Sequence, residues 1–187
     1  MNYNEKMKEI IKSLDFKKPK LLLHSCCAPC SSSVIEKTSN HFDITVLYYN
    51  PNIYPFEEYE IRKNEQKRFL ESLNIPLIEG DYIDSEFYNA VLGYENCAEG
   101  GDRCYRCYLL RMRKTVEMAK EKGFDYFCTT LSVSPHKNSV YINQIGEQLE
   151  KEYGVRFLYS DFMNEYGYFR SIQISKERNF WGITVLP

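Results

Sequence analysis

The sequence lacks the features that place a chain in a membrane or outside the cell. No stretch approaches the roughly 20 consecutive apolar residues of a membrane-spanning helix. The segment from Met1 to Leu14 has neither the apolar centre nor the small-residue cleavage site of a secretory signal. Net charge is also small, at -2 from 24 Lys and Arg against 26 Asp and Glu in 187 residues. We therefore expect a cytoplasmic protein without membrane contact, whose overall charge neither indicates nor excludes nucleic-acid binding.

A glycine-rich phosphate loop is also missing. The pattern G-x-x-x-x-G-K-[ST] does not occur. The turn after the first predicted strand is Ser25-Cys-Cys-Ala-Pro-Cys-Ser31, where a dinucleotide or pyrophosphate loop would need glycines. This composition argues against chemistry driven by a nucleotide.

Short apolar runs alternate with amphipathic stretches along the chain. An N-terminal amphipathic helix is expected first, and Gly123 and Gly154 stand where helices commonly end. The expected strands are Lys20–His24, Phe42–Tyr49, Ile75–Glu79, Phe124–Thr130 and Val155–Tyr159, and the expected helices are Ser31–Thr38, Phe56–Ser72, Asp84–Leu92, Tyr105–Lys122 and Ser139–Tyr153.

This alternation with short loops predicts a parallel sheet covered by helices on both faces and joined by right-handed crossovers. In such sheets, ligands bind at the carboxyl ends of the strands. The loops after the first, second and fourth strands contain Cys26 to Cys30, Asn50 to Asn52 and Ser132 to Pro135. We expect these loops to meet at one edge of the sheet.

Seven cysteines are more than a cytosolic domain of this size needs for stability. Cys128 lies inside an apolar strand and is expected to be a core residue. The others occur in loops and helix starts, where the helix dipole favours thiolates, so they indicate metal binding or redox chemistry. They form two groups: Cys26, Cys27 and Cys30, and Cys97, Cys104 and Cys107.

The spacing of these cysteines leaves several metal sites open. Cys104-Tyr-Arg-Cys107 is a C-x-x-C that can bind a metal or form a disulfide. The adjacent pair Cys26 and Cys27 favours an iron-sulfur cluster, because neighbouring residues can reach different irons more easily than one tetrahedral zinc. A closed zinc site and a dithiol oxidoreductase remain as alternatives.

The three histidines have different surroundings. His24 ends a strand, which is typical of a buried, hydrogen-bonded histidine more often than of an acid or a metal ligand. His136 lies in a loop at the expected site edge and is a candidate proton donor. His41 is expected in a surface turn.

Four motifs together resemble the QueH family of epoxyqueuosine reductases. The resemblance spans roughly Leu21 to Ser175, and its motifs occur in order. They are His24-Ser-Cys-Cys-Ala-Pro-Cys30, Tyr49-Asn-Pro-Asn-Ile-Tyr-Pro55 with Glu58, Tyr59 and Arg62, Gly100-Gly-Asp-Arg-Cys-Tyr-Arg-Cys107, and Thr129-Thr-Leu-Ser-Val-Ser-Pro135 with Lys137 and Asn138.

The resemblance implies reduction of epoxyqueuosine to queuosine in the wobble nucleoside of tRNA, with electrons from an unidentified donor. It also implies that Cys26, Cys27, Cys104 and Cys107 bind a [4Fe-4S] cluster. Cys30 and Cys97 then become candidate ligands of an additional metal ion or redox groups. His136 and Tyr54 are candidate proton donors for this chemistry.

A tRNA substrate gives weight to basic and aromatic residues near the cysteines. Such residues commonly contact phosphates and stack on unpaired bases. The expected phosphate contacts are Arg111, Arg113 and Lys114, with Arg103 and Arg106 beside them, and the expected stacking residues are Tyr48, Tyr49 and Tyr54.

We therefore expect residues 1–187 to form a single α/β iron-sulfur domain with a Rossmann-like (HUP-like) parallel sheet. Residues 1–19 are expected to be an N-terminal helical extension, and residues 176–187 an atypical tail, because no cysteine follows Cys128 whereas family members commonly end in a Cys-Gly-Cys pair. Two functional alternatives stay open: a non-enzymatic, zinc-stabilised RNA-binding domain and an ATP-dependent tRNA-thiolating enzyme.

Overall fold

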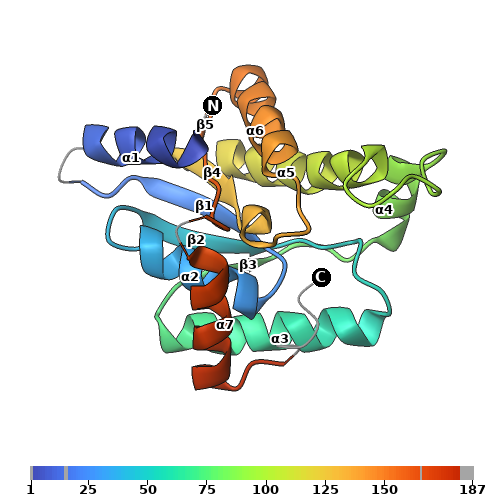
Figure 1. The fold of residues 1–187 in the computed structure, drawn as a ribbon, viewed down its shortest axis with the longest axis horizontal. Helices are drawn as coiled ribbons and strands as arrows, with labels where there is room; N and C mark the ends of the chain where they lie inside the picture. Colours follow the sequence, from blue (N-terminus) through green and yellow to red (C-terminus); the bar gives the residue numbers. More distant parts are fainter. Residues whose placement is uncertain (1, 15–16, 165, 182–187) are drawn as a thin grey trace.

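The computed structural model describes residues 2–14, 17–164 and 166–181 (Figure 1). Helix α1 comes first, with the Asn2 side chain accepting a hydrogen bond from the backbone N–H of Asn4 at 3.1 Å. The elements in chain order are α1 (Tyr3–Ser13), β1 (Lys20–Ser25), α2 (Ala28–Thr38), β2 (Asp43–Tyr48), α3 (Phe56–Ser72), β3 (Leu77–Glu79), α4 (Asp84–Val91), α5 (Asp102–Lys122), β4 (Tyr126–Thr129), the 3-10 turn η1 (Leu131–Val133), α6 (Ser139–Tyr153), β5 (Arg156–Phe157) and α7 (Gly167–Arg178).

The five strands form one parallel sheet in the order β3-β2-β1-β4-β5. This Rossmann-like order confirms the predicted α/β class. The strand order reverses between β1 and β4, which lie side by side with Leu21 opposite Tyr126 and His24 opposite Thr129. A crevice forms outside the carboxyl ends at such a reversal, because the two connections leave in opposite directions. The Cys26 loop follows β1 at this position.

Helices cover both faces of the sheet, as the sequence predicts (Figure 1). Leu21 and Leu23 of β1 point into a core shared with α2, α3 and α7. Leu22, between them, points to the opposite face and packs with α5 and α6. All three leucines are fully buried. Their alternation is the period of two that a strand imposes on its side chains, and burial on both faces explains the continuous apolar run in the sequence.

Two helices begin three residues earlier than expected. Helix α2 begins at Ala28, because the extended backbone of Cys27 (φ -171°) caps it and Pro29 fits the first turn. Helix α5 begins at Asp102, whose negative charge is favourable at a helix amino end, with Gly101 as the cap. As a result, Cys30 and Cys104 lie on helices rather than in the loops before them.

Helix α7 is absent from the sequence prediction. Its buried face contains Ser171, Ile174 and Ser175, so it lacks the apolar periodicity that identifies a helix. The two serine hydroxyls donate to backbone carbonyls of their own helix, at 2.6 Å each. Small buried residues let α7 pack closely on α2. Part of the tail predicted at 176–187 is therefore helical, and residues 182–187 lie outside the described part of the chain.

None of the helices in the described ranges is long and apolar enough to cross a membrane. The longest of them, α5, has 21 residues, but its exposed face is charged and only one stripe of it is buried. This is the pattern of a helix packed on a sheet.

Candidate metal centre

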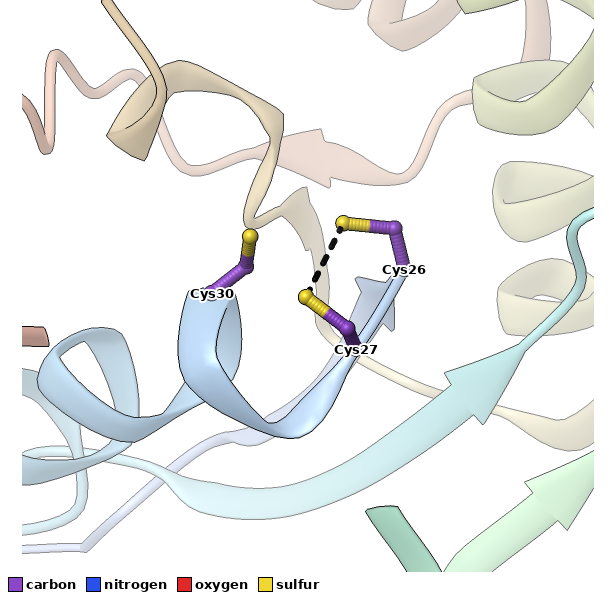
Figure 2. A group of neighbouring side chains, drawn as sticks. All are labelled: Cys26, Cys27 and Cys30. Atoms are coloured by element: carbon purple, nitrogen blue, oxygen red, sulfur yellow. Dashed lines mark hydrogen bonds between the residues drawn. The ribbon is translucent and has the colours of Figure 1, made fainter. Parts of the chain in front are cut away.

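Three cysteines meet where β1 connects to α2. Cys26 and Cys27 follow β1, and Cys30 lies in the first turn of α2. Their Sγ atoms all lie within 4.8 Å of one another, and those of Cys26 and Cys27 are 3.9 Å apart. Figure 2 shows the three thiols turned toward a common space. All three are free, and among the described residues they form the one group of at least three His, Cys, Asp or Glu side chains at this spacing.

A buried glutamine supports this cysteine group from α3. The Oε1 atom of Gln66 accepts a hydrogen bond from Ser25 at 2.6 Å, and its Nε2 donates to Ser31 at 3.0 Å. Ser25 precedes the cysteines and Ser31 follows them, so Gln66 holds both ends of the segment. Asn50 adds a third tether by donating from Nδ2 to the backbone carbonyl of Ser25 at 2.9 Å. Gln66, Asn50 and both serines are fully buried.

The cysteine group favours a single thiolate on Cys26. Hydrogen bonds donated by the thiols of Cys27 and Cys30 hold the pKa of Cys26 well below its usual value, and the positive charge of Arg111 acts in the same direction against the effect of burial. The same hydrogen bonds raise the pKa values of Cys27 and Cys30. Cys26 is therefore the thiol of this group most easily deprotonated, and any protons left on the three thiols would be released on binding a metal ion.

Two arginines place positive charge around these thiols. Arg62 of α3 donates from Nε to Glu58 at 2.7 Å. Burial works against its charge, but Glu58 and the nearby Cys27 and Cys26 raise the pKa of Arg62 overall. Arg111 reaches the group from α5, on the other face of the sheet. A site flanked in this way stabilises bound anions and thiolates.

His24 is a neutral structural residue. Its Nε2 lies 2.9 Å from the backbone carbonyl of Tyr49, which can only accept, so Nε2 carries the proton. Its Nδ1 then accepts from the hydroxyl of Thr129 at 3.0 Å. Burial, followed by the charge of Arg111, lowers the pKa of His24 to about 4. The interpretation of His24 as a buried, hydrogen-bonded histidine is confirmed.

The second cysteine group lies at the start of α5. Cys104 and Cys107 occupy its first two turns, and the backbone N–H of Gly100 donates to Sγ of Cys104 at 3.3 Å. In the described structure, neither they nor Cys97 join the close group at the end of β1. The two groups nevertheless lie at the same end of the sheet, because α5 packs on β1 and the charge of Arg111, one turn after Cys107, reaches Cys26. The four-cysteine ligand set stays a prediction.

The remaining predicted residues divide between surface and core. His136 is exposed in the loop after η1, and the side chain of Tyr54 is 77% exposed. His41 lies in an exposed turn, as expected. Cys128 is confirmed as a core residue: its thiol donates to the carbonyl of Leu158 at 3.3 Å, and burial raises its pKa to about 12.

The basic residues expected to contact RNA do not share one surface. Arg111 is only 3% exposed, which contradicts the expected phosphate contact, because its position falls on the buried stripe of α5. Arg113 is half-buried and pairs with Glu152 at 2.5 Å. Lys114 is also half-buried, with Nζ 5.7 Å from the centre of the Tyr49 ring.

The tyrosines expected to stack on bases are mostly core residues. Tyr48 and Tyr49 are 0% and 1% exposed, so neither ring can meet an RNA base, which corrects that expectation. The hydroxyl of Tyr49 donates to Glu86, and that of Tyr48 to the carbonyl of Tyr59. Tyr54 alone of the three keeps an exposed ring.

Sequence reasoning missed the roles of Gln66 and Arg111. Each lies on the buried stripe of its helix, Gln66 between Tyr59 and Phe69, and Arg111 beside Met112. A polar or charged residue at an otherwise apolar position of a helix was the available signal, because such a group is buried only with a partner.

Comparison with known proteins identifies the family. A family model described as "Epoxyqueuosine reductase QueH" matches residues 21–182. The protein of that name from Streptococcus pyogenes serotype M1 is 38% identical over 189 residues, covering 97% of this chain and 74% of the relative. That from Staphylococcus epidermidis is 36% identical over 191 residues, covering 97% and 80%. Among solved structures, the match to the NH3-dependent NAD synthetase from Campylobacter jejuni covers 100% of this chain and 89% of that protein's chain, with a TM-score of 0.45 and 12% identity. The chain belongs to the QueH family of epoxyqueuosine reductases, which are oxidoreductases.

Proposed function

We propose that this chain reduces epoxyqueuosine in tRNA to queuosine with an iron-sulfur cluster held where β1 and α5 meet at the carboxyl end of the sheet. The observation that carries the proposal is the group of three free thiols between Arg62 and Arg111. Family membership sets aside the non-enzymatic and tRNA-thiolating alternatives. The identity of the metal is the part that needs a test.

The residues at this site fit an iron-sulfur cluster. The donors are thiols without a disulfide, they are largely buried, and cationic side chains offset their charge. Thiolates are the usual ligands of such clusters. Cys26 and Cys27 from the end of β1 and Cys104 and Cys107 from α5 would hold it. Cys30 would then be free to bind an additional metal ion beside them.

The reaction removes the epoxide oxygen and leaves an alkene. Both C–O bonds break, a C=C bond forms, and the oxygen leaves as water, which takes up two electrons and two protons. These electrons must come from a redox group. When bound, an iron-sulfur cluster supplies them one at a time and offers iron as a Lewis acid for the oxygen. A separate reductant must replace these electrons after each turnover.

The protein positions this chemistry and delivers the protons. Gln66 and Asn50 fix the cysteine segment, as their hydrogen bonds show. His24 cannot donate a proton, because both ring nitrogens are bonded inside the core and it is neutral. His136, through a ring nitrogen, and Tyr54, through its hydroxyl, are exposed and remain the proposed donors.

Metal analysis tests the proposal most directly. The protein would be purified without oxygen and reconstituted, and iron, sulfide and zinc would be measured per chain. We expect about four irons and four sulfides in the parent, with loss in Cys26→Ala and in Cys107→Ala. Cys128→Ala is the matched control, because it removes a thiol from the core and should keep the cluster. One zinc without sulfide would contradict the proposed mechanism.

Binding of tRNA needs surface cations, and of the three residues first expected to contact phosphates, Arg111 is buried whereas Arg113 and Lys114 are partly exposed. Each phosphate contact that is lost should weaken binding and reduce the slope of log K against log salt by about 1. We expect this change for Arg113→Ala combined with Lys114→Ala, measured by filter binding at several salt concentrations. An unchanged slope would remove these two residues from the RNA surface.

A further inference from the structure

Arg111 is a buried cation without a carboxylate partner. Its side chain is 3% exposed, and its Nε donates to the backbone carbonyl of Cys107 at 3.3 Å. No ion pair within the described part of the chain includes it, whereas Arg62 pairs with Glu58 at 2.7 Å and Arg113 with Glu152 at 2.5 Å. A guanidinium stays protonated in proteins, so Arg111 cannot become neutral to avoid desolvation.

An unpaired buried charge is strongly unfavourable, so its presence requires an anion or a network of hydrogen bonds. The printed contacts of Arg111 are with neutral groups: the backbone carbonyl of Cys107 and the ring of Tyr108, whose centre lies 6.0 Å from the guanidinium. Cys107, whose carbonyl Arg111 contacts, and Cys26, on which its charge acts, would become anionic on binding a metal.

Arg111 interacts with both cysteine groups. The residue lies one helical turn beyond Cys107 and hydrogen-bonds to that residue's carbonyl, while its charge acts on Cys26 at the end of β1. Four thiolates around a [4Fe-4S] core give a dianion, and net charge is one of the factors that set the potential of such a cluster. A fixed cation that contacts the Cys107 backbone and whose charge acts on Cys26 matches that requirement.

We propose that Arg111 is the fixed counter-charge of the anionic group held by the cysteines, and that binding of this group compensates the burial of its charge. The inference rests on the proposed function. It makes Arg111 a positioning residue that acts through the ligands, and it explains why this arginine faces inward while the neighbouring basic residues of α5 reach the surface. Because added electrons increase the negative charge, Arg111 should also raise the reduction potential.

The test compares loaded and iron-free protein for the parent, Arg111→Met and Arg111→Lys. Methionine keeps the volume and the apolar stem but removes the charge. In iron-free protein, we expect Arg111→Met to unfold in urea at the same or a higher concentration than the parent. In loaded protein, we expect it to release iron to a chelator several-fold faster and to have a lower midpoint potential in an EPR-monitored titration. Arg111→Lys should recover part of both properties.

Lys120→Met is the control, because it removes a cation from the exposed face of the same helix. It should leave iron release and potential at parental values. Equal destabilisation of the loaded and iron-free forms of Arg111→Met would indicate a packing role and overturn the inference. So would unchanged iron release and potential in a fully loaded variant. A parent that retains neither iron nor sulfide would instead overturn the proposed function, and the inference with it.

Discussion

Gln66 of α3 holds the cysteine segment that follows strand β1. It is fully buried and bonds to Ser25 on one side of the cysteines and to Ser31 on the other. Each hydrogen bond of this kind contributes about 0.5–1.5 kcal/mol to stability. We therefore expect Gln66 to act on function by fixing the position of the cysteine segment.

Replacing Gln66 should reduce both stability and metal retention. We expect Gln66→Ala to lower the free energy of unfolding by about 2–4 kcal/mol, from the lost hydrogen bonds to Ser25 and Ser31 and a cavity, and to lower the iron content after reconstitution. Urea unfolding and iron analysis measure the two effects. Lys67→Ala, at the exposed neighbouring position, should change neither, and a Gln66→Ala protein with parental iron content would contradict the positioning role.

The proposed roles of His136 and Tyr54 as proton donors can be tested separately from cluster assembly. A general acid contributes about 10²–10⁴-fold to a rate, so the variant that removes the acting donor, His136→Gln or Tyr54→Phe, should slow turnover by that factor while iron and sulfide stay at parental values. Single-turnover assays on epoxyqueuosine-containing tRNA would measure it. Parental rates in both variants would show that neither side chain is the proton donor and would leave water in that role.

Helix α7 shows how packing between elements can depend on small and polar residues. Its buried serines lie against α2, and Arg170 reaches across to Glu36 with two hydrogen bonds of 2.7 and 2.8 Å. The side chains of Glu36 and Arg170 are 51% and 35% exposed, so water screens the pair. Such a pair contributes less than about 1 kcal/mol.

The ion pair between Glu36 and Arg170 makes the stability of the protein depend on pH. The hydrogen bond from Arg170 lowers the pKa of Glu36. The contribution of this ion pair to stability is fully present above the unfolded pKa of Glu36, about 4.3. It is lost as the pH falls through the lower pKa that Glu36 has in the folded protein. Glu36→Gln should therefore be slightly less stable than the parent at neutral pH and equal to it in strong acid. Urea titrations across that range would show the convergence. Glu57→Gln, at an exposed position of α3, is the control, and a constant difference would contradict the linkage.

At the scale of the whole molecule, the strand order brings distant segments together. The reversal between β1 and β4 opens the carboxyl edge where the first cysteine loop lies, and α5 brings the second cysteine group to the same end. A ligand bound by both β1 and α5 joins segments that are separated in sequence, so it should stabilise the native state globally.

Loading the cysteines should raise the stability of the entire chain. A ligand at 100 times its Kd adds about 2.7 kcal/mol to the free energy of unfolding, so we expect a single, higher Tm for the reconstituted protein in anaerobic calorimetry. Removal of iron by a chelator should reverse the rise, and Cys26→Ala should not show it. Identical Tm values for loaded and stripped parent would place metal binding outside the folded core.

The sequence alone determined the α/β class, the parallel sheet and the strand and helix that flank Cys26. These follow from local patterns: a continuous apolar run such as 21–23 predicts a strand buried on both faces, and a glycine such as Gly123 ends a helix with positive φ. The same patterns identified Cys128 as a core residue. They failed for α7, whose buried face contains serines.

Tertiary structure alone decided which neighbours each polar side chain meets. The sequence and its family resemblance predict Arg111 and Tyr49 as RNA contacts, but both are buried, Arg111 on the inner stripe of α5 and Tyr49 directly after β2. The grouping of Cys30 with Cys26 and Cys27 depends on the backbone of Cys27, which starts α2 early. The periodicity of a sequence indicates which side of a helix or strand is apolar. The partner of a buried charge lies on a segment distant in sequence, and only folding brings the two together.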